Sequence, residues 1–430
     1  MFSLIKQSEA RFSGLWTIAR TLFLLSVVYA VIVDMPLALE NILARKSRTP
    51  TYHFTAPEHA LAFSTPSWIK LGKDVLFLLA IVCVLIIAIR KGWWLPVSKS
   101  LQTWLVLILL IALLAVITLV RDGVWITLAG IRSHLALLAF LPGLFLRKND
   151  IEKIWHWLKY LMILQIGFSI WAAIDWDGSF SRHIFRLTGT FHNPNTLGLF
   201  GVSVLIFLFL ADVPVFRRWT YWGAGMAIIV FSGSRTAIAS AIFVTVAYGF
   251  MHIQSVRNRR FFVGVLLLSV PFFPLFLEWL SGRDDMLFHL FDSNFRLGAT
   301  WRYFVSVEPM QALLGEGLGR YTNTLYQLQG ITGIPSVHGF DNLFGNELAQ
   351  GGLLLLFSTL AFVFSPWLRL PHKFLSLALP GVVLGASIGV PLWEVWPANI
   401  LLIALYGYLY RDCVLDQNKY GDANSKSCQI

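Results

Sequence analysis

Residues that could act on an anionic substrate gather in one polar stretch, residues 281–346, of an otherwise apolar chain. The stretch contains Arg296, Arg302, Arg320 and His338, with aromatic residues between them. An arginine side chain presents a planar fork that donates paired hydrogen bonds to phosphate oxygens, and it keeps its positive charge. A neutral imidazole near a membrane surface can take a proton from an attacking hydroxyl. These residue types point to chemistry on a phosphate-bearing substrate.

A simpler interpretation of His338 also fits its surroundings. It precedes an apolar run in IPSVHGFDNLFGNELAQGG, and either Asp341 or Asn342 could cap the helix that this run predicts. Glu347, further along, could orient the imidazole or simply lie in the first turn of that helix. The residue types alone leave both interpretations open.

Three further segments carry polar groups at predicted loop positions. They are the loop 175–195 with Arg182 and Arg186, the turn SGSRTA at 232–237 with Arg235, and the turn VPLWEVWP at 390–397 with Glu394. A single arginine near a membrane often only anchors a span. Several arginines in different loops of one face are a stronger signal, because positive residues are disfavoured in non-cytoplasmic loops.

Metal and nucleotide motifs are weak in this sequence. The run GRDD at 282–285 lacks a supporting carboxylate cluster, and LLGEGLGRY at 313–321 contains G-x-G-x-G without the preceding strand of a nucleotide fingerprint. We interpret the glycine-rich run as a flexible turn that lets backbone approach a ligand. We expect neither a metal nor an organic cofactor. The repeated intramembrane carboxylates of an ion-coupled transporter are absent from the predicted spans.

The composition is that of a membrane protein. The 430 residues are 57% hydrophobic and 13% charged, with a mean hydropathy of +0.67, whereas a soluble domain carries about 25% charged residues. Long apolar runs without alternation predict helices rather than a barrel, since backbone groups in lipid must be satisfied internally. The net charge of +11 could suggest nucleic acid. We expect no such partner, because the basic residues lie mostly in short loops, where they set topology.

The sequence predicts an all-α, polytopic integral membrane protein with about twelve transmembrane helices. The apolar runs fall at 16–33, 74–90, 100–120, 124–146, 152–174, 195–211, 219–233, 235–252, 260–281, 347–365, 374–392 and 396–411. Residues 1–430 form a single membrane domain, and 281–346 is a helical loop segment between the ninth and tenth spans. The fourth span contains Arg132 and His134, and an intramembrane arginine normally faces a protein interior or a wet cavity.

Twelve spans put both termini on one side of the membrane, and the lysine and arginine distribution predicts that this side is cytoplasmic. The short, strongly basic loops lie there, among them RKNDIEK at 147–153 and SVRNRR at 255–260. The loop 34–73 is the contrary case, because it carries five basic residues on the opposite side. All segments with candidate site residues then share the non-cytoplasmic face.

Three stretches resemble the O-antigen ligase and O-antigen polymerase superfamily of bacterial envelope glycosyltransferases. FRLTGTFHNPNTLG at 185–198 is similar to the family's arginine, glycine and Asn-Pro-Asn pattern at the head of a span, and SGSRTA at 232–237 is similar to its Ser-Arg turn. The third stretch, 295–356, runs from FRLGATWRYF through LLGEGLGRY to VHGFDNLFGNELAQGGLLLL. It follows the family's order of arginine, tryptophan, glycine-rich turn and histidine before a Gly-flanked helix.

The resemblance implies an inverting, metal-independent glycosyl transfer at the periplasmic face of the bacterial inner membrane. The donor would be a glycan on undecaprenyl pyrophosphate and the acceptor lipid A–core, as in an O-antigen ligase. By the family's roles, Arg186 and Arg296 would hold the pyrophosphate and stabilise the leaving charge, and His338 would activate the acceptor hydroxyl. Arg302 is the alternative to Arg296, since the spacing from Arg296 to Trp301 is one residue longer than in the pattern.

Other functions remain open at this point. The remaining polar candidates would bind substrate in the leading interpretation: Arg182, Arg235, Arg302, Arg320 and Glu394. The close alternative is a polymerase that extends the glycan on the same carrier. A transporter of lipid-linked sugars would need cations along a path through the membrane, and the predicted spans hold only Arg132 and Lys159. A structural scaffold gives no reason for arginine and histidine to gather on one face.

Overall fold

The computed structural model describes residues 13–36, 67–90, 99–174, 189–191, 193–253, 296–322, 325, 340, 342–369 and 374–419. All regular secondary structure in these ranges is helical. The helices are α2 (Ser13–Ile32), α5 (Ser67–Arg90), α6 (Lys99–Asp122), α7 (Val124–His134), η1 (Leu135–Ala139), α8 (Phe140–Gly143), α9 (Lys148–Ile174), α10 (Pro194–Leu210), α11 (Val215–Phe231), α12 (Arg235–His252), α16 (Arg296–Ser306), α17 (Pro309–Leu314), α19 (Leu343–Arg369), α20 (Phe374–Ser387), η3 (Leu392–Glu394) and α21 (Ala398–Lys419). Each predicted span except the ninth coincides with one or more of these helices, and the ninth lies outside the described residues.

Among the described residues, five stretches of helix are long and apolar enough to cross a membrane. They are Gly14–Ile32, Ile69–Arg90, Leu101–Asp122, Val124–Gly143 and Leu343–Trp367. The helices Pro194–Leu210 and Phe374–Ser387 are also apolar but shorter. By length and composition, the chain is therefore a helical membrane-embedded protein.

Outward-facing apolar stripes on α5 and α6 agree with a lipid environment. On α5, Leu78, Val82, Leu85 and Ile89 are between 42% and 78% exposed, and they recur at the spacing of one helix face. On α6, the same spacing exposes Leu109, Leu113, Val116 and Val120. Contiguous apolar faces of this length are unfavourable in water but not against lipid chains.

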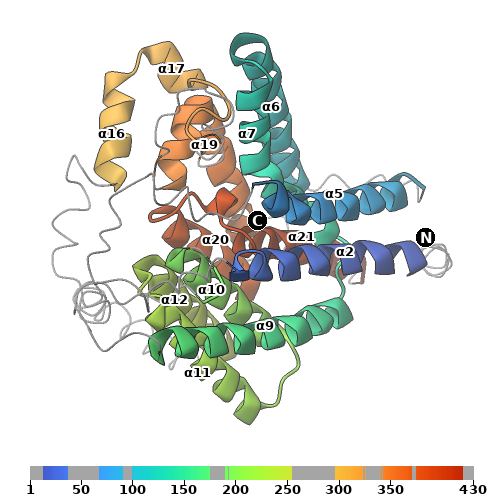
Figure 1. The fold of residues 1–430 in the computed structure, drawn as a ribbon. Helices are drawn as coiled ribbons and strands as arrows, with labels where there is room; N and C mark the ends of the chain where they lie inside the picture. Colours follow the sequence, from blue (N-terminus) through green and yellow to red (C-terminus); the bar gives the residue numbers. More distant parts are fainter. Residues whose placement is uncertain are drawn as a thin grey trace.

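The helices cross at large angles rather than forming a parallel bundle. In Figure 1, α2, α5 and α9 run across the view, whereas α6 and α7 run up it. α2 packs along α5, and α10 contacts α9, α11, α12 and α21. α12 packs on α20, and α19 contacts both α6 and α17.

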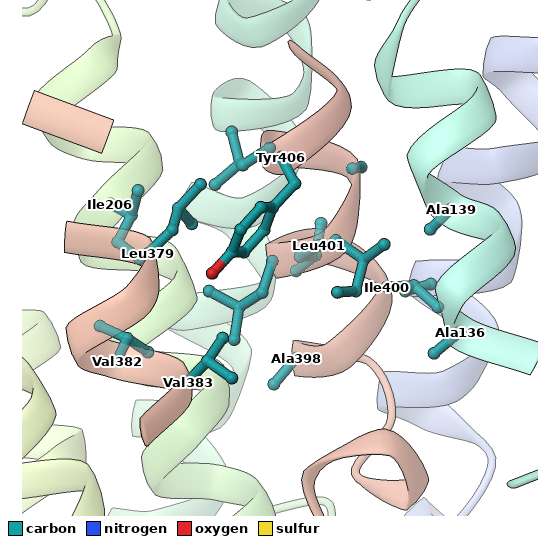
Figure 2. Close-up of a cluster of buried hydrophobic side chains, with 14 of the residues drawn as sticks. Ala136, Ala139, Ile206, Leu379, Val382, Val383, Ala398, Ile400, Leu401 and Tyr406 are labelled. Carbon is teal, nitrogen blue, oxygen red and sulfur yellow. The ribbon is translucent and has the colours of Figure 1, made fainter. Parts of the chain in front are cut away.

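The centre of the described core lies where α10, α20 and α21 meet. Every residue from Leu197 to Phe209 of α10 is buried. Tyr406 of α21 is fully buried among aliphatic side chains that include Leu379 and Ile206 (Figure 2). Its hydroxyl donates to the carbonyl oxygen of Val363 at 3.1 Å, which satisfies the one polar group that this large side chain brings into the core.

The predicted fourth span, 124–146, is interrupted rather than continuous. α7 ends at His134, and five residues of 3-10 helix, η1, follow before the short α8. Pro142 lies in α8 and has no backbone N–H, so it cannot donate to the carbonyl four residues earlier, within η1. The interruption follows directly after the two polar residues of this span, Arg132 and His134.

α19 contains the predicted tenth span, 347–365, but it is sharply bent. Gly352 has φ 64° and ψ −161°, which are not helical angles. Thr359 Oγ1 donates to Glu347 Oε2 at 3.2 Å across a separation of 12 residues, which would span about 18 Å in a straight helix. The halves of α19 before and after Gly352 must therefore bend toward one another. Its length and composition are those of a membrane-spanning helix. The bend at Gly352 means that it cannot cross the membrane as one straight helix.

The glycine-rich turn at 315–319 closes the bend. The carbonyls of Ala349 and Gln350 lose their helical donors, because helical bonding does not continue across Gly352. The backbone N–H of Glu316 donates to the Ala349 carbonyl at 2.7 Å, and that of Gly317 donates to the Gln350 carbonyl at 3.2 Å. These two bonds cap the first half of α19.

The same turn needs glycine because it packs backbone against backbone. Gly315 has φ +75°, and a Cβ there would lie 2.5 Å from the Gln350 carbonyl carbon. Gly319 has φ +103°, and a Cβ there would lie 2.0 Å from the Ile126 carbonyl oxygen of α7. The sequence predicts a flexible turn whose backbone approaches a ligand, whereas the described turn approaches the protein's own helices.

Gly352→Ala is expected to destabilise the protein, because the backbone angles of Gly352 lie in a region that costs other residues about 1–3 kcal/mol, and the added Cβ would lie 2.3 Å from the Leu313 carbonyl carbon. The matched control is Gly167→Ala in α9, where an added Cβ meets nothing within 4 Å and helix propensity favours alanine. Thermal unfolding of the purified full chain in detergent measures both. Equal unfolding temperatures for the two variants would contradict the packing described at Gly352.

Candidate functional site

Two ionisable side chains from distant parts of the chain meet inside the protein. His134 ends α7, and Glu347 lies in the first half of α19. His134 Nε2 lies 3.1 Å from Glu347 Oε1, and the two side chains are only 3% and 1% exposed. Thr359 Oγ1 donates to the other carboxylate oxygen. A buried charge requires such partners, because an unpaired one is very costly away from water.

Contacts on the opposite edge of the imidazole fix the ring of His134. Nδ1 lies 2.9 Å from the Gly130 carbonyl oxygen and 2.9 Å from Ser133 Oγ. Ser133 Oγ donates its own proton to the Gly130 carbonyl at 2.7 Å, so it faces Nδ1 with a lone pair. Both neighbours of Nδ1 accept, which assigns a proton to Nδ1. α7 thus presents the Nε2 edge to Glu347.

A small cavity lies beside this pair, where α7, α19 and η3 meet. Its polar lining residues are Ser133, His134, Asn346, Glu347, Gln350 and Glu394. Glu394, partly buried in η3, brings a second carboxylate to the cavity. Two carboxylates and an imidazole around one cavity can bind and exchange a proton.

Arg132, on the same helix as His134, belongs to a second charged cluster. Its Nε donates to Asp74 Oδ2 at 2.9 Å, and Lys73 Nζ donates to Asp74 Oδ1 at 2.8 Å. The Lys73 ammonium also lies 4.4 Å from the centre of the Trp396 ring. Asp74 is 5% exposed, so two cations share one buried carboxylate. The fourth span therefore turns its arginine toward a protein partner, as the sequence predicts.

The described parts of the 281–346 segment join the head of α19. The Asn342 amide donates to Thr300 Oγ1 of α16 at 3.0 Å, and the rings of Tyr303 and Phe340 pack with centroids 5.4 Å apart. Asn342 Oδ1 accepts from the Gly345 backbone N–H at 2.7 Å, which confirms one of the two predicted caps. We call α16, the turn 315–319 and the first half of α19 the α19-head unit.

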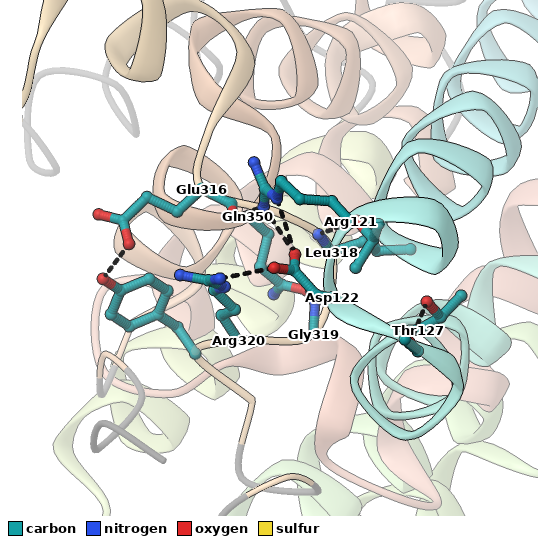
Figure 3. A network of polar contacts seen from close by, with 11 residues as sticks. Arg121, Asp122, Thr127, Glu316, Leu318, Gly319, Arg320 and Gln350 are labelled. Atoms are coloured by element: carbon teal, nitrogen blue, oxygen red, sulfur yellow. Dashed lines mark hydrogen bonds and ion pairs between the residues drawn. The ribbon is translucent and has the colours of Figure 1, made fainter. Parts of the chain in front are cut away.

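A polar network ties the turn of this unit to the end of α6 (Figure 3). Asp122 accepts from Arg121 at 2.7 Å and from Arg320 at 2.5 Å. Its side chain is 4% exposed, whereas the arginine side chains are 47% and 43% exposed. Arg121 also donates to the Glu316 carbonyl. One buried carboxylate thus orients two arginines that remain open to solvent.

The carboxylate of Glu316 organises two aromatic side chains in the same network. It accepts from the hydroxyls of Tyr303 and Tyr321 at 3.0 and 2.8 Å. Burial and the nearby Glu316 carboxylate both raise the pKa of Tyr303 and of Tyr321 well above the ordinary value. Both phenols stay neutral at physiological pH and act as hydrogen-bond donors.

Several predicted site residues fall outside the described part of the chain. Arg182, Arg186 and His338 lie there, and so does the side chain of Arg296, whose backbone begins α16. Phe340, two residues after His338, packs against Tyr303 of the same α16.

The described candidates do not form one cluster. Glu394 lines the cavity beside His134. Arg320 pairs with Asp122, and Arg302 is exposed on α16. Arg235 begins α12, a helix outside the α19-head unit, and is partly buried.

The sequence flags His134 as unusual inside an apolar run, but it does not reveal the partner of this histidine. Glu347 lies 213 positions away, and the sequence places it only beside His338 or in the first turn of a helix. Asp74, at the start of a predicted span, is likewise missed as a buried counter-ion. The only sequence signal for these buried residues was a polar or charged side chain within or beside an apolar run.

Comparison with known proteins finds no match for the chain among protein-family models, curated proteins or solved structures.

Asp74→Asn is expected to destabilise the protein by about 3–5 kcal/mol, because it leaves Arg132 and Lys73 without their buried carboxylate. Asp212→Asn is the matched control. Asp212 lies 3.7 Å from Lys148, and both side chains are mostly exposed, so its loss should change stability little. Thermal unfolding of the purified variants tests the contrast, and similar losses for both would show that the Asp74 cluster contributes little.

Proposed function

We propose that the chain is a glycosyltransferase of the bacterial inner membrane, with about twelve transmembrane helices, both termini in the cytoplasm and its active site at the periplasmic face. It moves a glycan from undecaprenyl pyrophosphate to lipid A–core, as an O-antigen ligase in lipopolysaccharide biosynthesis. The stretches at 185–198, 232–237 and 295–356 support this proposal.

The structural observation that carries the proposal is the α19-head unit. The segments after Arg296 and after His338 belong to one packed unit, joined by the Tyr303–Phe340 contact and by Asn342. A transferase of this kind needs a base for the acceptor and a cation for the leaving group within reach of one substrate. Packing of these two segments into one unit supports the proposal, because it is consistent with a base and a cation acting on one substrate.

In the proposed reaction, the acceptor hydroxyl oxygen attacks the anomeric carbon of the glycan from the face opposite the pyrophosphate. The new carbon–oxygen bond forms as the bond to the pyrophosphate oxygen breaks, and the hydroxyl proton passes to His338. The electron pair leaves with the pyrophosphate, and Arg186 and Arg296 stabilise the charge. Pyrophosphate is already a good leaving group, so this mechanism needs cations and positioning and no metal.

A carrier of lipid-linked sugars is the second candidate, and one observation favours it. Charged side chains lie inside the helical body, in the His134–Glu347 pair and the Asp74 cluster, where ion-coupled transporters place such groups. A carrier would move a labelled lipid-linked sugar from one side of a vesicle membrane to the other without forming a new glycosidic bond. The enzyme assay below separates the two functions.

Arg186→Ala, Arg296→Ala and His338→Ala are each expected to reduce glycan transfer by at least about 100-fold, because each removes a group that acts in the transition state. The measurement is transfer from undecaprenyl-pyrophosphate glycan to lipid A–core by equal amounts of purified protein. The controls are Arg217→Ala and His156→Ala, whose side chains are exposed on α11 and α9. Full transfer by all three site variants would refute the assignment.

Chelation by EDTA is expected to leave the initial rate of transfer unchanged, because arginines rather than a metal ion carry the leaving charge. The rate is measured before and after dialysis of the purified protein against the chelator. Loss of activity that returns on adding a divalent cation would contradict the metal-free mechanism.

Deleting the gene in its host distinguishes ligase from polymerase. Loss of the lipopolysaccharide ladder, with long glycan retained on undecaprenyl pyrophosphate, indicates a ligase. Single repeats on the carrier or on the core indicate a polymerase, and an unchanged ladder contradicts both.

A further inference from the structure

We propose that His134 and Glu347 form a buried proton-binding site that links the first half of α19 to α7. This inference rests on the geometry of the pair and its cavity, and it holds whether the chain is a transferase or a carrier.

Hydrogen-bond counting assigns one extra proton to the pair. Nδ1 of His134 faces two acceptors, the Gly130 carbonyl and the Ser133 lone pair, so it carries a proton. Nε2 lies 3.1 Å from a carboxylate oxygen, and this contact also needs a proton between its atoms. That proton resides on the ring or on Glu347. Either way, the pair holds one proton more than a neutral imidazole beside a carboxylate.

The alternative tautomer loses contacts that the structure contains. If Nε2 carried the only ring proton, Nδ1 would face the Gly130 carbonyl at 2.9 Å with lone pairs on both atoms. Ser133 would have to turn its proton from that carbonyl to the ring. The doubly protonated ring beside the carboxylate satisfies all of these groups.

Charged groups on η3, α7 and α5 either favour retention of the proton or are neutralised. Glu394 of η3 adds a second negative charge at the cavity. Arg132 of α7 opposes it, but Arg132 is paired with Asp74 of α5. The pair is deeply buried, with both side chains at most 3% exposed, and burial of an unpaired carboxylate would be unfavourable.

A further cavity residue points to a polar occupant. Trp393 is 2% exposed and lines the cavity, and its indole N–H has no acceptor among the described protein residues. Buried N–H groups are nearly always satisfied. A water that accepts from Trp393 and donates to a cavity carboxylate would satisfy it, and would give the bound proton a route of exchange.

Loss of the proton would set a neutral imidazole lone pair against the Glu347 carboxylate. The pair joins α7 to the first half of α19, which carries the Asn342 cap at its start. The proton therefore strengthens the contact between α7 and this half-helix, which the turn 315–319 and packing on α6 also hold in place.

The test is the pH dependence of unfolding for the purified full chain in lipid nanodiscs, between about pH 6 and about pH 9. An unfolded imidazole has lost its proton over most of this range, whereas the proposal gives the folded pair one proton more. Unfolding then releases a proton, so the wild-type unfolding constant should rise by up to about tenfold per pH unit. His134→Gln and Glu347→Gln should each reduce that slope. His156→Gln, which changes an exposed histidine of α9, should keep it.

The double variant His134→Leu/Glu347→Leu keeps the proposal testable if the single variants fail to fold. Replacing both members of a buried pair by apolar residues is often neutral, so this protein should fold and show the reduced slope. A wild-type slope in the double variant would overturn the proposal. The readout is unfolding rather than glycan transfer, so its failure is distinct from failure of the proposed function.

Discussion

Gly352 bends α19, and the bend removes the helical donors of the Ala349 and Gln350 carbonyls. In a protein with little internal water, such groups must find other partners. The glycine-rich turn supplies them through the N–H groups of Glu316 and Gly317. Because the turn is held there, it also meets α6 and α7, where the Asp122 network and the contact of Gly319 with Ile126 complete the packing.

The same bend decides where the charge of Glu347 lies. One carboxylate oxygen accepts from Thr359 of the second half of α19, and the other faces His134 of α7. A straight helix would hold Thr359 about 18 Å further along and leave the carboxylate with one partner fewer. The bend at Gly352 thus fixes both the backbone partners of α19 and the burial of Glu347. Through these contacts the turn 315–319 and the first half of α19 are joined to α7 and to the second half of α19.

The proposed transferase and the proposed proton site place different demands on α19. Transfer from a pyrophosphate needs cations and a base held at fixed positions, and it needs little covalent chemistry from the protein. The α19-head unit meets the need for fixed positions through α16, the turn and Asn342. A proton bound between His134 and Glu347 would strengthen the link between α7 and the first half of α19, and so connect a group inside the helical body to the α19-head unit.

The sequence by itself determined the helical membrane class and the positions of most helices, because hydropathy over some twenty residues is a local property that lipid enforces directly. It also indicated a cap at Asp341 or Asn342 and the inward preference of Arg132, since capping and intramembrane charge follow local rules. Only the tertiary structure decided that α19 bends at Gly352, that the glycine-rich turn serves the protein's own backbone, and that Glu347 pairs with His134. These outcomes depend on contacts between residues up to 213 positions apart, and no local pattern encodes which distant group will satisfy a buried polar atom.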